Sequence, residues 1–103
     1  MDIETVAMTI IAHSGEARTA AFKALQSAKS GNFEEAEELM KESEKESIEA
    51  HNAQTELLVS EANGDKTEVN VLLVHSQDHL MTSILAQELI KEIIYLHKSK
   101  SDK

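Results

Sequence analysis

The sequence predicts an all-α fold, an antiparallel bundle of three long helices that forms one domain. The 103 residues include no Pro and three Gly, so few positions would interrupt a helix. Hydrophobic residues make up 41% of the chain and aromatic residues 3%, so the core is aliphatic and Ala-rich, which suits helices better than sheets. Two short polar segments, around Gly31 and Gly64, divide the chain into three stretches of similar length.

The first helix is expected over residues 3–29. Many of its residues at helical spacing are Ala, whose small side chains allow a neighbouring helix to approach closely. Gly31 suits the left-handed conformation that ends many helices, and Asn32, three residues before Glu35, is close to a capping box. The second helix is therefore expected over residues 33–62. Its many acidic residues are most simply explained as a solvated helical face.

The third helix is expected over residues 68–98, with Thr67 as its N-cap, followed by a flexible tail at 99–103. Sixteen of the 28 residues from 69 to 96 are apolar, and they are not confined to one face. A helix that is apolar nearly all round is buried on more than one side. We therefore expect this helix to pack against copies of itself, and we expect an oligomer. Short connections make the neighbouring helices antiparallel.

The charge of the chain argues against two classes of partner. Nineteen acidic residues against ten basic ones give a net charge of −9, which disfavours nucleic acids and anionic membrane surfaces. The absence of Cys excludes disulfides, thiol nucleophiles and thiolate metal sites. Asp2 and Glu4 stand where a signal peptide carries positive charge, and no apolar run approaches the ~18 residues of a membrane-spanning helix. We expect a cytoplasmic protein without direct membrane insertion.

The candidate functional residues lie in the third predicted helix. On a helical wheel, Asp78 occupies the middle of the most apolar stripe, where an unpaired carboxylate is costly and needs a partner or a metal. His75 and His79 lie one turn apart on the border of that stripe. Gln77 points too far round the helix to assist His75 of the same chain. It could serve only a neighbouring subunit or another partner.

Three interpretations of this segment fit the composition. The first is a pair of core histidines with an Asp that stabilises the helix. The second is a small metal-dependent hydrolase, because two His at i and i+4 form half of a zinc site, although no third protein ligand is evident. The third is a nucleophilic His75 that carries a transferred group, with His79 assisting. Helical periodicity does not separate the first interpretation from the third.

Residues 74–82, VHSQDHLMT, closely resemble the active-site signature of the lactose/cellobiose family of enzyme IIA components. These components belong to the bacterial phosphoenolpyruvate-dependent sugar phosphotransferase system. Three further blocks are similar to the family: GEAR at residues 15–18, AKSGNF at 28–33 and EAHNAQT at 49–55. The resemblance covers essentially the whole chain. Ser76 stands where the family often has Ala or Gly, but it points about 100° away from His75 on the wheel.

The resemblance implies a homotrimer of three-helix protomers, nine helices in all, with a metal ion on the threefold axis held by one Asp78 per chain. It implies that His75 accepts phosphate on Nε2 from the histidine phosphocarrier protein and passes it to a cysteine of the IIB component during uptake of a β-linked disaccharide of the cellobiose or lactose type. Since an all-oxygen cage suits Mg²⁺ or Ca²⁺ better than Zn²⁺, we expect a divalent cation, with Mg²⁺ as the first choice. A non-catalytic helical interaction module remains the alternative, ahead of the hydrolase.

Three other residues have an open role at this stage. His13 lies beside Ser14-Gly15, an interruption that could let another helix come close, and either lines the phosphate pocket or packs structurally. His51 either lines the same pocket or acts as a structural hydrogen-bond donor, and Arg18 either neutralises phosphate or is solvated. The identity of the sugar leaves no imprint on the sequence, because a IIA component does not touch it.

Overall fold

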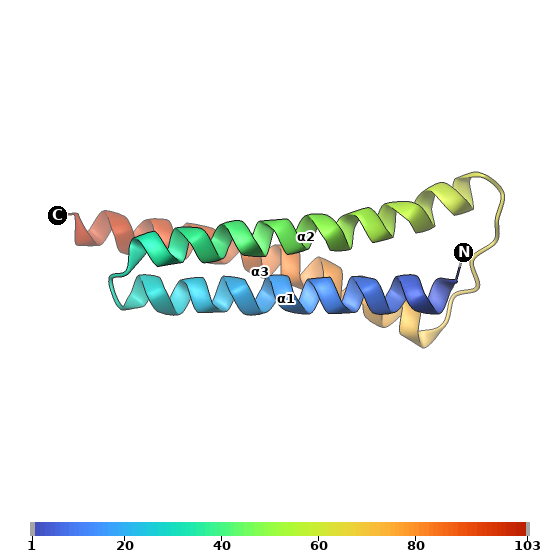
Figure 1. Ribbon diagram of the computed structural model, residues 1–103, viewed down its shortest axis with the longest axis horizontal. Helices are drawn as coiled ribbons and strands as arrows, with labels where there is room; N and C mark the ends of the chain where they lie inside the picture. Colours follow the sequence, from blue (N-terminus) through green and yellow to red (C-terminus); the bar gives the residue numbers. More distant parts are fainter. Residues whose placement is uncertain (1, 103) are drawn as a thin grey trace.

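The computed structural model describes residues 2–102 and consists of three helices: α1 (Ile3–Lys29), α2 (Phe33–Ala62) and α3 (Val71–Ser101). They run up, down and up along a rod with extents of 56 × 20 × 16 Å (Figure 1). No strand occurs among residues 2–102, which confirms the all-α prediction. Across the same residues, no helix combines the length and the apolar character needed to cross a lipid bilayer.

The turn between α1 and α2 forms as predicted. Gly31 adopts a φ of +83°, in the left-handed region that favours glycine. The side-chain oxygen of Asn32 accepts a hydrogen bond from the backbone N–H of Glu35 at 3.3 Å, and the Asn32 amide donates to the Glu35 carboxylate at 2.8 Å. Asn32 therefore caps α2, which begins at Phe33. The return contact differs from a capping box, because Glu35 accepts from the side-chain amide of Asn32 and not from its backbone N–H, which donates to the Ser27 carbonyl oxygen.

Both predicted ends of the third helix were wrong. The helix starts at Val71 rather than at residue 68, because Asn70, and not Thr67, caps it: Asn70 Oδ1 accepts from the Leu73 N–H at 2.9 Å. Asn is the stronger N-cap of the two residue types. At the other end the helix continues to Ser101, so residues 99–101 do not form the expected flexible tail. Lys98 and Lys100 in the last turn favour the continued helix, since they oppose its dipole.

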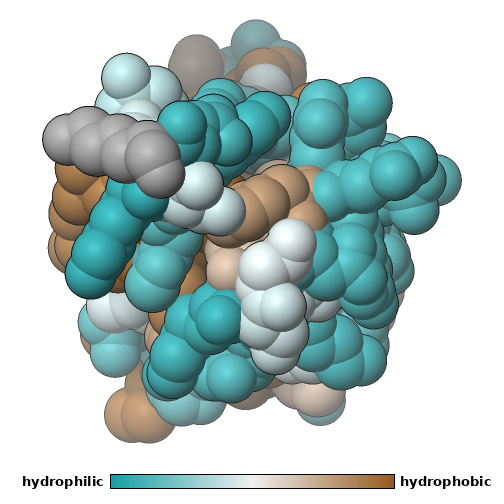
Figure 2. All heavy atoms as spheres, turned by 90° about the vertical axis from the view of Figure 1, so that its left-hand side faces the viewer, coloured by the Kyte–Doolittle hydropathy of each residue, from teal (hydrophilic) through white to brown (hydrophobic). Residues whose placement is uncertain are grey.

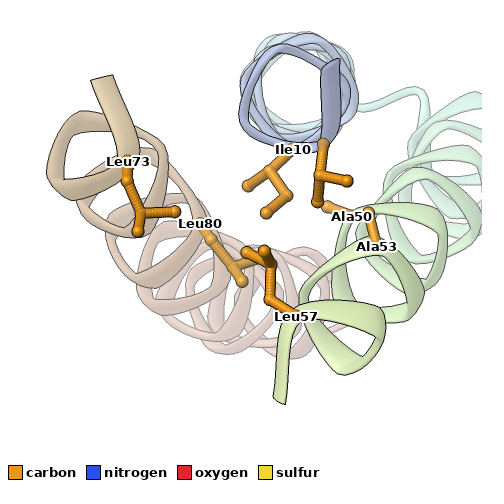
Figure 3. Close-up of a cluster of buried hydrophobic side chains, with 7 residues drawn as sticks. Ile10, Ala50, Ala53, Leu57, Leu73 and Leu80 are labelled. Carbon is orange, nitrogen blue, oxygen red and sulfur yellow. The ribbon is translucent and has the colours of Figure 1, made fainter. Parts of the chain in front are cut away.

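Two apolar clusters run along the inside of the bundle. One lies at the end of the rod near the start of α1 and α3, where Ile10, Leu57 and Leu80 converge between the three helices (Figure 3). The other combines Ile90 and Met40 with the alanines of α1. Ala17, Ala21 and Ala24 of α1 have no exposed surface, which confirms that these small residues permit close approach.

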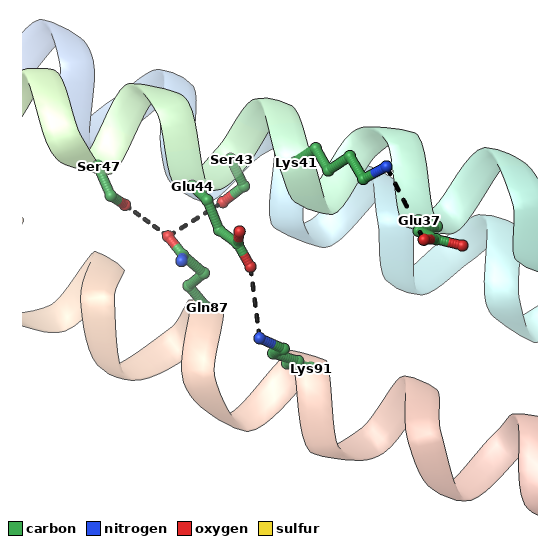
Figure 4. A network of polar contacts seen from close by, with 7 residues as sticks. All are labelled: Glu37, Lys41, Ser43, Glu44, Ser47, Gln87 and Lys91. Atoms are coloured by element: carbon green, nitrogen blue, oxygen red, sulfur yellow. Dashed lines mark hydrogen bonds and ion pairs between the residues drawn. The ribbon is translucent and has the colours of Figure 1, made fainter.

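Helices α2 and α3 meet through polar side chains. The hydroxyls of Ser43 and Ser47 on α2 both donate to Oε1 of Gln87 on α3, and Lys91 forms an ion pair with Glu44 at 3.5 Å (Figure 4). The Ser43 hydroxyl also lies 2.6 Å from the carbonyl oxygen of Ala17. These polar groups span the α2–α3 seam, whereas α1 makes the close apolar contacts with both of its neighbours.

One side of α3 is apolar and lies outside the bundle. We call it the α3 apolar face, and its members are Val71, Val74, Met81, Leu85, Leu89 and Leu96. Each of them is at least 55% exposed in the single chain. Large apolar residues gathered on one exposed face are typical of interaction surfaces.

We predict that Ala24→Leu destabilises the bundle. Ala24 is fully buried at the contact of α1 with its neighbours, so the added carbon atoms force strain that costs about 1–3 kcal/mol. Urea unfolding followed by circular dichroism measures the loss. Ala12→Leu is the matched control, because Ala12 lies on the exposed side of the same helix. Equal stability of the two variants would contradict the packing described for α1.

Candidate functional site

His75 and His79 face one another across adjacent turns near the start of α3. Their Nε2 atoms are 3.1 Å apart, and their rings meet edge to face with centroids 4.4 Å apart and planes at 87°. His75 is exposed and His79 is half-buried. The two rings are thus close enough to interact directly, and the assisting role of His79 stays a prediction.

The contact between the two Nε2 atoms has a chemical consequence. At a separation of 3.1 Å one nitrogen carries a proton and donates it to the lone pair of the other. With neutral rings, the accepting histidine has an unprotonated Nε2, which is the nucleophilic form of imidazole. When His79 is the donor, the lone pair on Nε2 of the exposed His75 is the one held in place.

The inner side of α3 determines where these rings point. Leu73, Ser76 and Leu80 are buried at i, i+3 and i+7, and Leu73 and Leu80 join the apolar cluster around Ile10. The Ser76 hydroxyl donates to the carbonyl oxygen of Leu73 at 2.6 Å, so the buried hydroxyl is paired within its own helix. Ser76 thus faces the core and away from His75, and it leaves the histidine pair intact.

Gln77 and Asp78 point in two other directions. Gln77 is half-buried against α2, where its Oε1 accepts a hydrogen bond from Nε2 of Gln54. The helical wheel did not predict this partner in α2. Asp78 is exposed in the middle of the α3 apolar face. Over residues 2–102, its carboxylate has neither a hydrogen-bond partner nor an ion-pair partner.

Sequence reasoning missed Gln54 as a member of this constellation. Its position on α2 carries no chemical signal by itself, because glutamine is common on solvated helical faces. The available signal was the antiparallel register of α2 and α3. A register that brings Glu44 beside Lys91 also brings residue 54 near residue 77.

The three residues whose role was open lie elsewhere in the chain. His13 on α1 binds Glu46 of α2, with Nδ1 2.6 Å from Oε2. The Arg18 guanidinium lies over the ring of Phe22, 5.7 Å from its centroid. His51 is exposed on α2. Within the part of the chain that the structure describes, none of the three contacts His75 or His79.

Across residues 2–102, no three His, Asp or Glu side chains converge to form a metal site. The hydrolase interpretation therefore still lacks the third ligand that it lacked in the sequence. Asp78 supplies one unpartnered carboxylate per chain.

The histidine pair lies on open surface. A groove of about 490 Å³ runs between α2 and α3 near the opposite end of the rod, lined by Phe33, Met40, Lys91 and Tyr95 among others. Figure 2 looks onto that end and shows apolar surface between hydrophilic side chains. His75 and His79 do not line this groove. Because His75 is exposed, a second macromolecule can reach its ring directly.

Comparisons with known proteins agree with this geometry. The family model described as "PTS system, Lactose/Cellobiose specific IIA subunit" matches residues 5–98. The chain is 47% identical over 97 residues to the N,N'-diacetylchitobiose-specific EIIA component of the PTS system of Escherichia coli K12, which covers 94% of this chain and 84% of that one.

Two solved structures are also similar. The cellobiose-specific enzyme IIA of the PTS from Bacillus anthracis superposes with a TM-score of 0.96 at 47% identity, over 100% of this chain and 94% of that one. The IIA(Chitobiose)-HPr complex gives a TM-score of 0.85 at 44% identity, over 98% of each chain.

We predict that His79→Asn shifts the ring ¹⁵N resonances of His75. Removing the imidazole removes the contact at 3.1 Å that biases the His75 tautomer. Two-bond ¹H–¹⁵N correlation spectra at neutral pH report the change. His13→Gln serves as the control and should leave the His75 resonances in place, because His13 pairs with Glu46 instead. A His75 spectrum indifferent to His79→Asn would count against the paired rings.

Proposed function

Because this chain belongs to the lactose/cellobiose-specific IIA family of the phosphotransferase system, we propose that it carries a phosphoryl group on His75 between two protein partners. The observation that supports this role is the exposed His75 ring, with its Nε2 held 3.1 Å from Nε2 of His79. The donor is the histidine phosphocarrier protein, and the acceptor is a cysteine of a IIB component. The similar IIA(Chitobiose) protein has a solved complex with HPr. The role places the protein in the cytoplasm.

In the first transfer, the protein contributes mainly by positioning the reacting groups and stabilising their charge. The lone pair on His75 Nε2 attacks the phosphorus of the donor phosphohistidine. A P–N bond to His75 forms as the P–N bond to the donor breaks, and the donor imidazole keeps the electron pair. His79 lies close enough for its Nε2–H to turn from His75 to a phosphoryl oxygen. In the second transfer a thiolate of the IIB component attacks the same phosphorus and His75 leaves as a free imidazole.

The charge around His75 favours a basic donor protein. Residues 2–15 and 48–82 make up the part of the rod that contains His75, and they hold eight acidic residues and one lysine (Figure 1). Such an excess attracts a partner with a positive surface and speeds its encounter. The open surface around His75 leaves room for that partner to dock.

The α3 apolar face supports assembly into a homotrimer. Three parallel copies of α3 around one axis would cover this face, which a single chain leaves exposed. His75 and His79 lie on one side of the face and Gln77 on the other. In a parallel helical trimer, one side of each helix meets the opposite side of the next. Gln77 of one subunit would therefore approach His75 of its neighbour.

The same arrangement brings three Asp78 carboxylates to the axis. Two unit charges ~4 Å apart repel by about 4 kcal/mol at an effective dielectric of ~20, and three such pairs exceed what a small domain tolerates. Within residues 2–102 of the single chain, the Asp78 carboxylate has no partner. This supports a role for Asp78 as a metal ligand together with its two symmetry copies. We propose that the three carboxylates hold Mg²⁺, which would neutralise their charge.

We predict that His75→Ala abolishes labelling by phosphoenolpyruvate in the presence of the general phosphotransferase proteins. The substitution removes the nucleophile, whereas helix content and oligomeric state persist because His75 is exposed. The wild-type label should be stable to base and labile to acid. His51→Gln is the matched control, an exposed histidine on α2 that should label normally. No label on the wild type would favour an interaction module, and metal-dependent ester hydrolysis would favour the hydrolase.

We predict that Asp78→Leu gives a trimer at least as stable as the wild type, and that its melting temperature no longer depends on chelator. The change removes the carboxylate repulsion and the metal, and it extends the α3 apolar face. Sedimentation and thermal unfolding with and without chelator measure both effects. A lower melting temperature for Asp78→Leu than for the wild type would contradict the axial metal.

A further inference from the structure

Gln54 and Gln77 form an amide pair across the α2–α3 seam. Gln54 Nε2 on α2 donates to Gln77 Oε1 on α3, and both side chains are half-buried. The pair lies two residues along α3 from His75. Among the polar contacts of the α2–α3 seam, this one lies at the end of the rod that contains the histidine pair (Figure 1).

The direction of this hydrogen bond fixes what Gln77 presents to its other side. An amide has one acceptor oxygen and two N–H donors. Since Gln77 Oε1 accepts from Gln54, both N–H groups of Gln77 Nε2 remain available to a third group. A Gln77 amide turned the other way would put its oxygen toward that third group. If the third group is an anion, the observed orientation is favourable, because the anion then meets N–H donors and not an oxygen.

We propose that Gln54 is a positioning residue for phosphoryl transfer, which holds the Gln77 amide so that its N–H groups donate to the phosphoryl oxygens on His75 of the adjacent subunit. This role rests on the proposed function and on the trimer. The site then combines His75 and His79 from one chain with Gln77 and Gln54 from the next. Hydrogen-bond donors held in advance toward developing negative charge are an effective form of catalytic assistance.

Gln87 makes a similar polar contact between α2 and α3, but it has no part in phosphoryl transfer. It also joins α3 to α2, and its Oε1 accepts from the hydroxyls of Ser43 and Ser47 (Figure 4). It lies twelve residues beyond His75, which is about 18 Å along the helix. Gln87 thus serves the α2–α3 seam alone, and it provides a matched control for a loss of helix–helix contact.

The test is Gln54→Glu, which keeps the shape of the side chain but replaces the donor by an acceptor. The carboxylate would draw the Gln77 N–H groups toward α2 and turn Oε1 toward the phosphoryl group. Purified full-length protein is phosphorylated by its carrier in stopped-flow or quench-flow experiments. We expect kcat for transfer onto His75 to fall about 10- to 100-fold, with KM for the carrier within about two-fold.

Three controls separate positioning from other effects. Thr55→Glu adds the same charge at the exposed neighbouring position, and Gln87→Glu alters the other bridge; both should keep kcat near the wild-type value. Gln54→Lys keeps a donor and should retain most of the transfer. In a Gln77→Leu background, Gln54→Glu should cause no further loss, because Gln54 acts through Gln77.

The outcomes that overturn the proposal are distinct from those that overturn the function. If the wild type is labelled at His75 and Gln54→Glu has the same kcat, Gln54 does not position the site. An equal loss in Thr55→Glu or Gln87→Glu, or an additional loss in the Gln77→Leu background, also overturns it. A wild-type protein that takes no label would overturn the carrier function itself.

Discussion

The burial of Leu73, Ser76 and Leu80 on one side of α3 fixes the rotation of that helix about its own axis. The two leucines join the apolar cluster with Ile10 and Leu57, and the Ser76 hydroxyl is paired within the helix. With this side committed to the core, the other directions follow from helical periodicity. The histidine pair points to solvent, Asp78 joins the α3 apolar face, and Gln77 turns toward α2. A small rotation of α3 would misplace all of them together.

The spacing of the helices depends on two kinds of contact. Alanines along α1 let both neighbours approach closely, so α1 forms the apolar centre of a single chain. The α2–α3 seam is bridged instead by glutamine, serine and a lysine–glutamate pair. Polar bridges of this kind hold two helices in register without closing the space between them. Gln77, near His75, therefore has a defined hydrogen-bond partner in Gln54 of α2, and both side chains stay partly exposed to solvent.

Much of the fold could be predicted because its signals are local. The turn at Gly31-Asn32 has the residue types that left-handed termination and capping require, and the structure forms both. The start of α3 was misplaced because Thr67 and Asn70 are both capable caps, and the prediction took the weaker of the two. The contact of Gln54 with Gln77 could not be read locally, since it depends on the register of two helices. The axial arrangement of Asp78 depends on other chains, and it remains a proposal.

The acidic surroundings of His75 bear on the energy of a phosphoryl group placed there. Eight acidic residues and one lysine occupy that part of the rod. A phosphoryl dianion on Nε2 would thus sit in a field of its own sign, which raises its free energy relative to a basic pocket. A phosphoryl group whose bound state has a raised free energy is transferred readily to the next nucleophile. The same residues that attract a basic donor would hence keep the protein from becoming a sink for the phosphate it receives.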